Sequence, residues 1–280
     1  MRILITGVFG FVGSHLTRLL QDTHDVTGVW NNQFEEEQFK NIALINASEI
    51  DSIEIEPDIV ILCHAAVSSG NMDEKESVLQ KSNVAFTQTI TKRFPDSYFI
   101  YLSSASVYKE SKEKITENSE TDALSPYAKS KLQAENIISK LNASCILRLP
   151  SLFGSNMKER TIVPIYVNQA LKNKEILVFG KGSRAQNYLS ITELIQCVLN
   201  CVEKQPKGLF LVVGKEEHTN LELASIISKY LSAKLTFVKE DNSVSCFYNN
   251  EVSKLALGVT SGNQFEQEIK NYIDWKRKQS

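Results

Sequence analysis

Short apolar runs alternate with amphipathic stretches along the first 150 residues. The runs are rich in Val, Ile and Leu at successive positions, as in strands buried on both faces of a parallel sheet. The stretches between them show the spacing of helices that cover such a sheet. We expect strands at 2–6, 26–30, 41–46, 58–66, 98–104 and 144–149, and helices at 12–21, 82–93 and 126–141. This order predicts an α/β fold with a doubly wound parallel sheet.

The pattern loosens after Pro150. Here we expect helices at 164–173, 191–203, 221–231 and 264–276, and strands at 176–183 (ending in a turn), 208–214 and 234–238. The run 208–214 is apolar enough to return to the main sheet. No repeat, low-complexity tract or long linker separates the two halves. We therefore expect a domain over 1–150, which takes back segments near 187–214, and a smaller substrate-binding lobe, mainly 151–280, intertwined with it.

Composition argues against several classes of partner. A net charge of −2 and a pI near 6.2 do not suggest nucleic acid or an anionic membrane surface. No run approaches the length of a membrane span, and the apolar residues 3–5 are too few for a signal peptide. The five cysteines include no CxxC pair, so neither a disulfide framework nor a zinc site is indicated. We expect a cytoplasmic protein without a bound metal.

Three glycines follow the first predicted strand, in the stretch TGVFGFVG. Gly7 would permit a sharp turn, Gly10 the approach of a pyrophosphate, and Gly13 close packing of helix on strand. The helix N-terminus would offer free N–H groups and a partial positive charge to the phosphates. Strand, glycine loop and helix together predict a Rossmann-type dinucleotide site, whose contacts also include Phe9, Phe11 and Val12.

The second strand does not end in the acidic residue that usually binds the adenine ribose. Trp30, Asn31 and Asn32 stand there instead, and an Asn amide can donate to a hydroxyl or to a phosphate. Arg18 could approach a 2′-phosphate, although it also fits the polar face of its helix. We expect Asn31 and Asn32 to contact the cofactor, and both NAD and NADP remain open.

Two further stretches carry candidate chemistry: SSASVY ends the fifth predicted strand, and YAKSK opens the next helix. Tyr127 and Lys131 are four residues apart and so share one helix face. A free tyrosine has a pKa of about 10, and a nearby ammonium, with the positive nicotinamide ring, favours its phenolate. Ser104, at the carboxyl end of its strand, is placed to bond the same substrate oxygen. We expect these three residues to be catalytic, with Tyr127 and Lys131 also contacting the cofactor.

Taken together, these stretches resemble the extended short-chain dehydrogenase/reductase family, in its sugar-nucleotide epimerase/dehydratase branch. The resemblance spans nearly the whole chain and also includes PDIVILCHAA (57–66), Asn83, RLPSLFG (148–154), IVPIYVNQAL (162–171) and ILVFGKGSRAQNYLSITEL (176–194). It implies that Ser104, Tyr127 and Lys131 are the catalytic triad and that the glycines hold the pyrophosphate. It further implies that Ala65 and Ala66 let the cofactor pass the fourth strand, that His64 packs or hydrogen-bonds, and that the chain forms a homodimer.

The residues after the catalytic serine narrow the reaction. Dehydratases of this family usually have Asp and Glu where Ala105 and Ser106 stand, so dehydration is disfavoured. Enzymes resembling GDP-fucose synthase have a cysteine at the position of Ala105 and a histidine at the position aligned with Thr161, and they use both to invert carbons 3 and 5. Neither Ala105 nor Thr161 can supply those protons, so inversion at carbons 3 and 5 is disfavoured too. Two reactions remain: reduction of a nucleotide-linked 4-keto-6-deoxyhexose, in deoxysugar or surface-polysaccharide synthesis, and 4-epimerisation. The short chain favours the reductase.

The substrate side of the chain is less typical of the family. We expect substrate contacts from Ser104, Ala105, Ser106, Ser151, Arg184 and Asn187. Arg184 would replace an arginine that normally meets the nucleotide diphosphate. Two other classes are weighed against a sugar-nucleotide enzyme. A non-catalytic dinucleotide sensor or scaffold would typically lose the tyrosine or the lysine, and a phenolic or steroid ketone reductase would need a wider apolar lobe.

Overall fold

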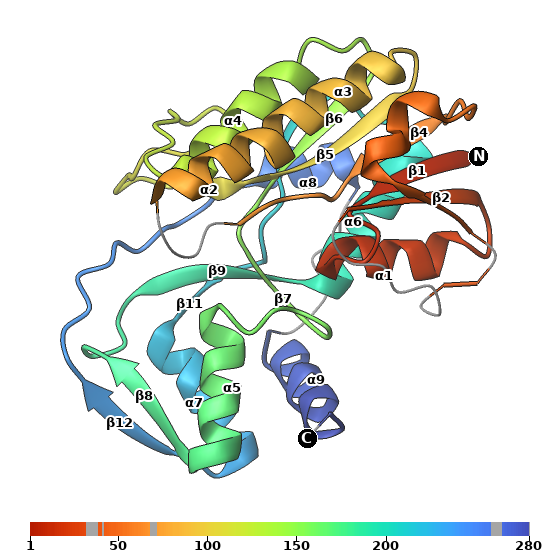
Figure 1. The fold of residues 1–280 in the computed structure, drawn as a ribbon. Coiled ribbons are helices and arrows are strands. Elements are labelled where there is room, and N and C mark those ends of the chain that lie inside the picture. Colours follow the sequence, from red (N-terminus) through yellow and green to blue (C-terminus); the bar gives the residue numbers. More distant parts are fainter. Residues whose placement is uncertain (32–38, 41, 68–71, 259–264, 280) are drawn as a thin grey trace.

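The computed structural model describes residues 1–31, 39–40, 42–67, 72–258 and 265–279, and a parallel sheet runs through its larger part (Figure 1). The strand order is β10-β6-β5-β4-β1-β2-β3, and every neighbouring pair is parallel. The predicted α/β doubly wound fold is confirmed. The strands are β1 (Arg2–Thr6), β2 (Asp25–Trp30), β3 (Ala43–Asn46), β4 (Ile59–Leu62), β5 (Tyr98–Ser104), β6 (Ser144–Leu149) and β10 (Gly208–Leu211).

Helices cover both faces of this sheet, which explains why its strands are apolar at successive positions. In β4, Ile59 and Ile61 belong to one core cluster and Val60 and Leu62 to another. The first cluster lies under α1 (Phe11–Leu20), α6 (Ile191–Lys204) and α8 (Glu251–Leu257). The second lies under α3 (Phe86–Arg93) and α4 (Pro126–Ile138), which α2 (Met72–Leu79) and a π-helical segment (Gln80–Ala85) precede. Short 3₁₀ turns span Ala47–Ser52 and Ala105–Val107.

A smaller lobe has its own core and two small sheets (Figure 1). One sheet joins β7 (Ser151–Phe153), β9 (Ala185–Ser190) and β11 (Glu217–Thr219), and the other pairs β8 (Glu175–Phe179) with β12 (Lys234–Val238). The helices α5 (Ile162–Asn173), α7 (Asn220–Leu231) and α9 (Phe265–Arg277) complete it. Fully buried Val167, Ile227 and Ile273, one from each helix, meet in its core.

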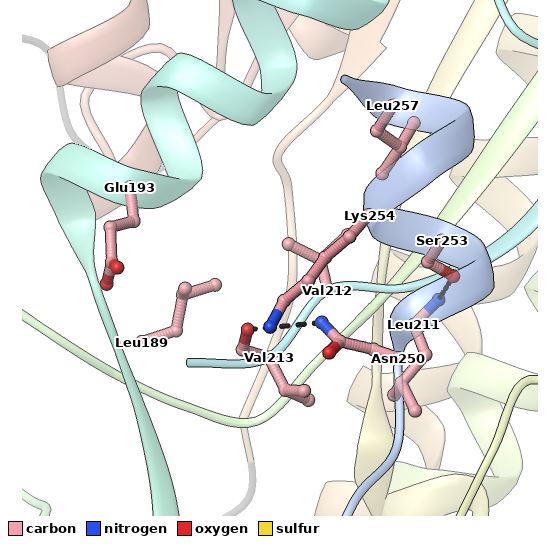
Figure 2. Close-up of a pocket in the computed structure, with 9 residues that line it drawn as sticks. All are labelled: Leu189, Glu193, Leu211, Val212, Val213, Asn250, Ser253, Lys254 and Leu257. Atoms are coloured by element: carbon pink, nitrogen blue, oxygen red, sulfur yellow. Dashed lines mark hydrogen bonds between the residues drawn. The ribbon is translucent and has the colours of Figure 1, made fainter. Parts of the chain in front are cut away.

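The chain passes between the lobe and the sheet more than once. After β9 in the lobe it forms α6 and β10 against the main sheet, and then returns to form β11 (Figure 1). At the open edge of β10, the Leu211 amide donates to Ser253 Oγ of α8 (2.8 Å), and Asn250 donates to the Val213 carbonyl (3.3 Å). Figure 2 shows this region, where α8 and the end of β10 line a small, mostly apolar cavity. The division into 1–150 and 151–280 stays a prediction.

Several expected elements differ in extent from those observed. The strand expected at 58–66 ends at Leu62, because its partner β1 ends at Thr6 in the paired register. The helix expected from 82 begins at Met72, where the polar sequence MDEKE shows no apolar stripe. The strands expected from 41 and up to 214 run from Ala43 and up to Leu211. The strands β7, β9 and β11 and the helix α8 had no distinct signal in the sequence.

Candidate functional site

The predicted site residues lie mainly at the carboxyl edge of the parallel sheet. The glycine loop follows β1, Ala65 and Ala66 follow β4, and Ser104 ends β5. In doubly wound folds this edge is where ligands bind, since the loops of neighbouring strands diverge there. The fold thus gathers segments that lie far apart in the sequence.

The glycine loop is built by close backbone approach. Gly7 has a φ of +65°, and a Cβ there would lie 3.0 Å from the backbone of His64. A Cβ on Gly13 would lie 2.2 Å from the Gly7 carbonyl oxygen, so only glycine fits. The Gly10 amide donates to that same oxygen at 2.8 Å. Gly10 also caps α1 without a side chain, which leaves the first N–H groups of the helix open to an anion.

Aromatic side chains flank this loop on the side of β2. Phe9 stacks on Phe39 with ring centroids 5.6 Å apart, and the Arg18 guanidinium lies 5.8 Å over the Phe39 ring. Asn31 is exposed after β2, while Asn32 lies outside the described residues. The expected contacts of Phe9, Phe11, Val12 and Asn31 with a cofactor stay predictions.

Asn83 holds the segment after β4 that contains Ala65 and Ala66. Its Oδ1 accepts from the Ala66 amide (2.8 Å), and its Nδ2 donates to the Ala66 carbonyl (3.1 Å) and to Ser130 Oγ (2.9 Å). Asn83 belongs to the π-helical segment, a feature that often marks functional positions. The segment after β4 is thereby tied to α4, which carries the predicted catalytic pair.

Three successive residues of β5 interact with three residues on one face of α4. The Lys131 ammonium donates to the Leu102 carbonyl (2.8 Å), and Ser103 Oγ donates to the Glu135 carboxylate (2.5 Å). Ser104, the next residue of β5, interacts with the Tyr127 phenol and favours its ionisation. Because Tyr127, Lys131 and Glu135 are spaced four apart, their side chains lie on one face of α4. The sequence prediction that Ser104, Tyr127 and Lys131 lie together therefore agrees with the geometry, although their catalytic role stays a prediction.

Burial dominates the ionisation of Tyr127 and Lys131 in the chain. Burial raises the pKa of the Tyr127 phenol to about 12, and the hydrogen bond from Ser104 opposes that rise. Burial also lowers the pKa of the Lys131 ammonium to about 8, opposed by Cys63 and Glu135. The Lys131 ammonium is bonded to Leu102 and lies 4.8 Å over the Tyr101 ring, and the expected lowering of the Tyr127 pKa by Lys131 with the nicotinamide ring stays a prediction.

Two residues behind this face were not singled out from the sequence. Glu135 and Arg148 form a buried ion pair, with Arg148 nitrogens 2.6 and 3.0 Å from the two carboxylate oxygens. The spacing of Glu135, one helical turn after Lys131, is a signal that could have identified it. Only the fold could show that Arg148, on β6, meets it.

The residues that follow Ser104 point in different directions. Ser106 is exposed, and its Oγ lies 2.9 Å from Ser104 Oγ. Ala105 is 6% exposed and packs with Val107 and Leu211. The expected substrate contact of Ser106 is compatible with this exposure, whereas Ala105 presents little surface to a ligand.

The lobe residues expected to bind substrate are placed less uniformly. Ser151 lies half-buried in β7, and Arg184 is half-buried with its Nε donating to the Val244 carbonyl (3.4 Å). Asn187 is 3% exposed, and its amide is engaged with Gly214, accepting from the amide (2.7 Å) and donating to the carbonyl (3.1 Å). Through these bonds Asn187 joins β9 to the segment after β10. Its amide is thereby occupied, so the structure does not support the expected substrate contact of Asn187.

Neither a metal centre nor a membrane-spanning helix is present among the described residues. No group of three or more His, Cys, Asp or Glu side chains there could hold a metal ion. Within the same residues, none of the helices has the length and apolar character needed to cross a membrane.

Comparison with known proteins identifies the family of the chain. The model of the NAD dependent epimerase/dehydratase family matches residues 3–214. A putative UDP-glucose 4-epimerase of Methanocaldococcus jannaschii is 24% identical over 98% of both chains, and a dTDP-glucose 4,6-dehydratase of Haemophilus influenzae is 23% identical over 98% of this chain and 97% of its own.

Solved structures show the same fold. The UDP-glucuronic acid 4-epimerase of Bacillus cereus, in complex with NAD, is 21% identical with a TM-score of 0.87 over 99% of both chains. The UDP-glucose 4-epimerase of Thermotoga maritima, with UDP-glucose, is 18% identical with a TM-score of 0.87, covering 100% of this chain and 99% of its own. With the family model matched over most of its length, the chain belongs to the NAD-dependent epimerase/dehydratase family.

Proposed function

We propose that the chain is an NAD-dependent 4-epimerase of a nucleotide-linked hexose. The observation that carries this proposal is the assembly of Ser104, Tyr127 and Lys131 at the end of β5, with Ala105 and Ser106 beside them. One tyrosine can move a proton to and from a single sugar oxygen. Ala105 and Ser106 add no further acid or base, which an elimination of water would require.

The named relatives bear on the choice between the two reactions left open by the sequence. UDP-glucose and UDP-glucuronic acid 4-epimerases are among the proteins similar over nearly the whole chain. They favour epimerisation over the reduction of a 4-keto-6-deoxyhexose that the short chain suggested. The reductase becomes the second candidate.

The proton chemistry follows from the hydrogen bonds at the end of β5. Tyr127 would remove the proton of the sugar 4-hydroxyl and later return it to the same oxygen, while Ser104 holds that oxygen. Bound NAD would supply reversible acceptance of the C4 hydride. In the chain alone burial raises the pKa of Tyr127 to about 12, and a positive charge brought by the bound dinucleotide would favour its phenolate. Between the two half-reactions the keto sugar must turn its other face, so the site must leave the sugar free to rotate.

The glycine loop fits a dinucleotide on structural grounds. The space beside Gly7 and Gly13 is closed to any Cβ, and the first turn of α1 has no side-chain cap. Gly7, Gly10 and Gly13 would hold the pyrophosphate, Ala65 and Ala66 would border it, and Lys131 would hold the nicotinamide ribose. We propose NAD, which several structural relatives bind, with Asn31 near the adenine ribose.

On the substrate side, we propose that Ser151 and Arg184 border the nucleotide, since a guanidinium suits a diphosphate. Arg184 is half-buried, and its charge adds to the bonds from Ser243 that mainly hold the pKa of the Asp241 carboxyl low. The homodimer through the helices near Tyr127 and the cytoplasmic location, which suits five unpaired thiols, remain proposals. A monomeric mass in solution would remove the dimer.

The direct test is to incubate the purified chain with NAD and UDP-glucose and to follow UDP-galactose by NMR. We expect interconversion without net change in reduced nicotinamide, and a loss of about 10²- to 10⁴-fold with Tyr127→Phe. Tyr272→Phe is the matched control, because its buried hydroxyl has no hydrogen-bond partner within the part of the chain that the structure describes. If instead the chain consumes NADH or NADPH with a nucleotide-linked 4-keto-6-deoxyhexose, the reductase replaces the epimerase. Binding of NAD without either reaction would favour a sensor or another substrate class.

A further inference from the structure

His64 stands directly beneath the glycine loop, at the point where β1, β4 and α3 meet. A Cβ on Gly7 would lie 3.0 Å from both the His64 amide nitrogen and its Cα, so the loop rests on this residue's backbone. The side chain extends toward α3, where its ring meets the Phe86 ring edge to face with centroids 4.9 Å apart. A leucine could fill this space by packing alone. The hydrogen bonds of the imidazole are therefore what distinguishes His64 from an apolar residue at this position.

Both ring nitrogens of His64 are hydrogen-bonded, and their partners determine the tautomer. The Thr87 hydroxyl donates to the Asn83 carbonyl (2.8 Å), so its oxygen is left to accept from His64 Nε2 (3.2 Å). The Thr6 hydroxyl lies 2.7 Å from His64 Nδ1 and 3.4 Å from the Ile61 carbonyl, so it donates to Nδ1, the nearer acceptor. Burial, with Lys131 adding to it, lowers the pKa of His64 to about 3, which keeps the ring neutral and able to accept at Nδ1.

The bridge joins the two sides of the predicted cofactor site. Thr6 is the last residue of β1 before Gly7, and Thr87 follows the π-helical segment that contains Asn83. Asn83 in turn holds the Ala66 amide and carbonyl. We propose that His64 is a positioning residue, which fixes the glycine loop relative to the Ala65–Ala66 wall by joining Thr6 to Thr87, and so sets the affinity for the dinucleotide. This rests on the proposed binding of NAD, although not on the identity of the sugar.

The bridge makes a specific prediction for three variants. His64→Leu keeps the bulk but removes both bonds, and Thr6→Val removes the Nδ1 bond at nearly constant shape. Thr6→Val leaves the buried Nδ1 of His64 unpaired, and His64→Leu separates Thr6 from Thr87, so we expect each to weaken NADH binding about tenfold. The double variant should also lose about tenfold rather than about a hundredfold, because both changes break the same bond. His64→Asn, whose amide can replace Nδ1, should recover most of the affinity.

The experiment is a fluorescence titration of the full chain with NADH, with near-UV circular dichroism to confirm folding. Thr17→Val is the control, because the buried Thr17 hydroxyl has no hydrogen-bond partner among the described residues and should leave NADH affinity unchanged. Unchanged affinity in Thr6→Val, or single-variant factors that multiply in the double variant, would overturn the role of the bridge. If His64→Leu does not fold, Thr6→Val and His64→Asn decide the question alone. Failure of the unsubstituted chain to bind NADH would instead refute the proposed cofactor, whereas binding without epimerisation would refute only the proposed reaction.

Discussion

The glycine loop and the catalytic face lie along the same edge of one sheet, yet they are built in opposite ways. The loop works by leaving side chains out, so that the Gly7 carbonyl, the Gly10 amide and the start of α1 come into direct contact. The face between β5 and α4 works by burying polar side chains, among them Lys131 and Glu135, each 3% exposed. A backbone cradle depends on steric fit, whereas the face depends on charge balance. Substitutions should therefore fail for different reasons in the two regions.

The largest effect is expected from the buried ion pair behind the catalytic face. Glu135→Gln leaves the Arg148 charge without its partner at a site that is 5% exposed. We expect a loss of about 3 to 5 kcal/mol in the free energy of unfolding, measured with urea. Glu120→Gln is the matched control: its ion pair with Lys109 is exposed and screened by solvent, so the loss of stability should be far smaller. Equal losses in both variants would show that charge burial is not what distinguishes this face.

The second effect concerns the same face and depends on pH. The pKa of Lys131 falls from 10.5 to about 8 on folding, so between these values the folded chain binds fewer protons than the unfolded chain. The free energy of unfolding then gains up to about 3 kcal/mol from this group as pH rises from 8 toward 10.5. Lys131→Met removes the gain. Its stability should therefore fall progressively behind that of the unsubstituted chain between pH 8 and 10, and a constant difference would contradict the pKa.

The glycine loop should respond to size and not to charge. Gly13→Ala places a Cβ 2.2 Å from the Gly7 oxygen, whereas Gly10→Ala places one at 3.0 Å. Relieving the first clash requires a backbone shift, with a cost of about 1 to 3 kcal/mol. We expect NADH affinity to fall about 10- to 100-fold in Gly13→Ala and distinctly less in Gly10→Ala. The reverse order in a binding titration would mean that the loop is set by something other than this contact.

The smallest effect is expected at the exposed rim of the catalytic face. Ser106→Ala removes a hydroxyl that bonds Ser104 but is open to solvent. A single exposed hydrogen bond contributes about 1 kcal/mol, so we expect kcat for epimerisation to fall by less than about tenfold. Ser104→Ala, which also removes the hydroxyl that favours ionisation of Tyr127, should reduce kcat more. A larger loss in Ser106→Ala than in Ser104→Ala would assign Ser106 a direct part in the reaction.

The elements that the sequence predicted most accurately are those defined by the pattern of neighbouring residues. The strands β5 and β6 match their predicted ranges, and the spacing of Tyr127 and Lys131 places them on one face of α4 as expected. The sequence was less predictive in the lobe, where β9 pairs with residues 151–153 on one side and 217–219 on the other. Such strands of three to six residues are defined by partners that are distant in the sequence, and their own short sequences do not predict them.

The sequence by itself determined the parallel sheet and the glycine loop, because hydrophobic period and glycine spacing act over a few residues. It also placed Tyr127 one helical turn before Lys131. Only the tertiary structure decided that Glu135 meets Arg148, that Asn187 is engaged with Gly214, and that His64 joins Thr6 to Thr87. Each of these contacts links segments well separated in the chain. Their burial, which also sets the pKa values of Tyr127 and Lys131, exists only once the sheet and its helices have packed.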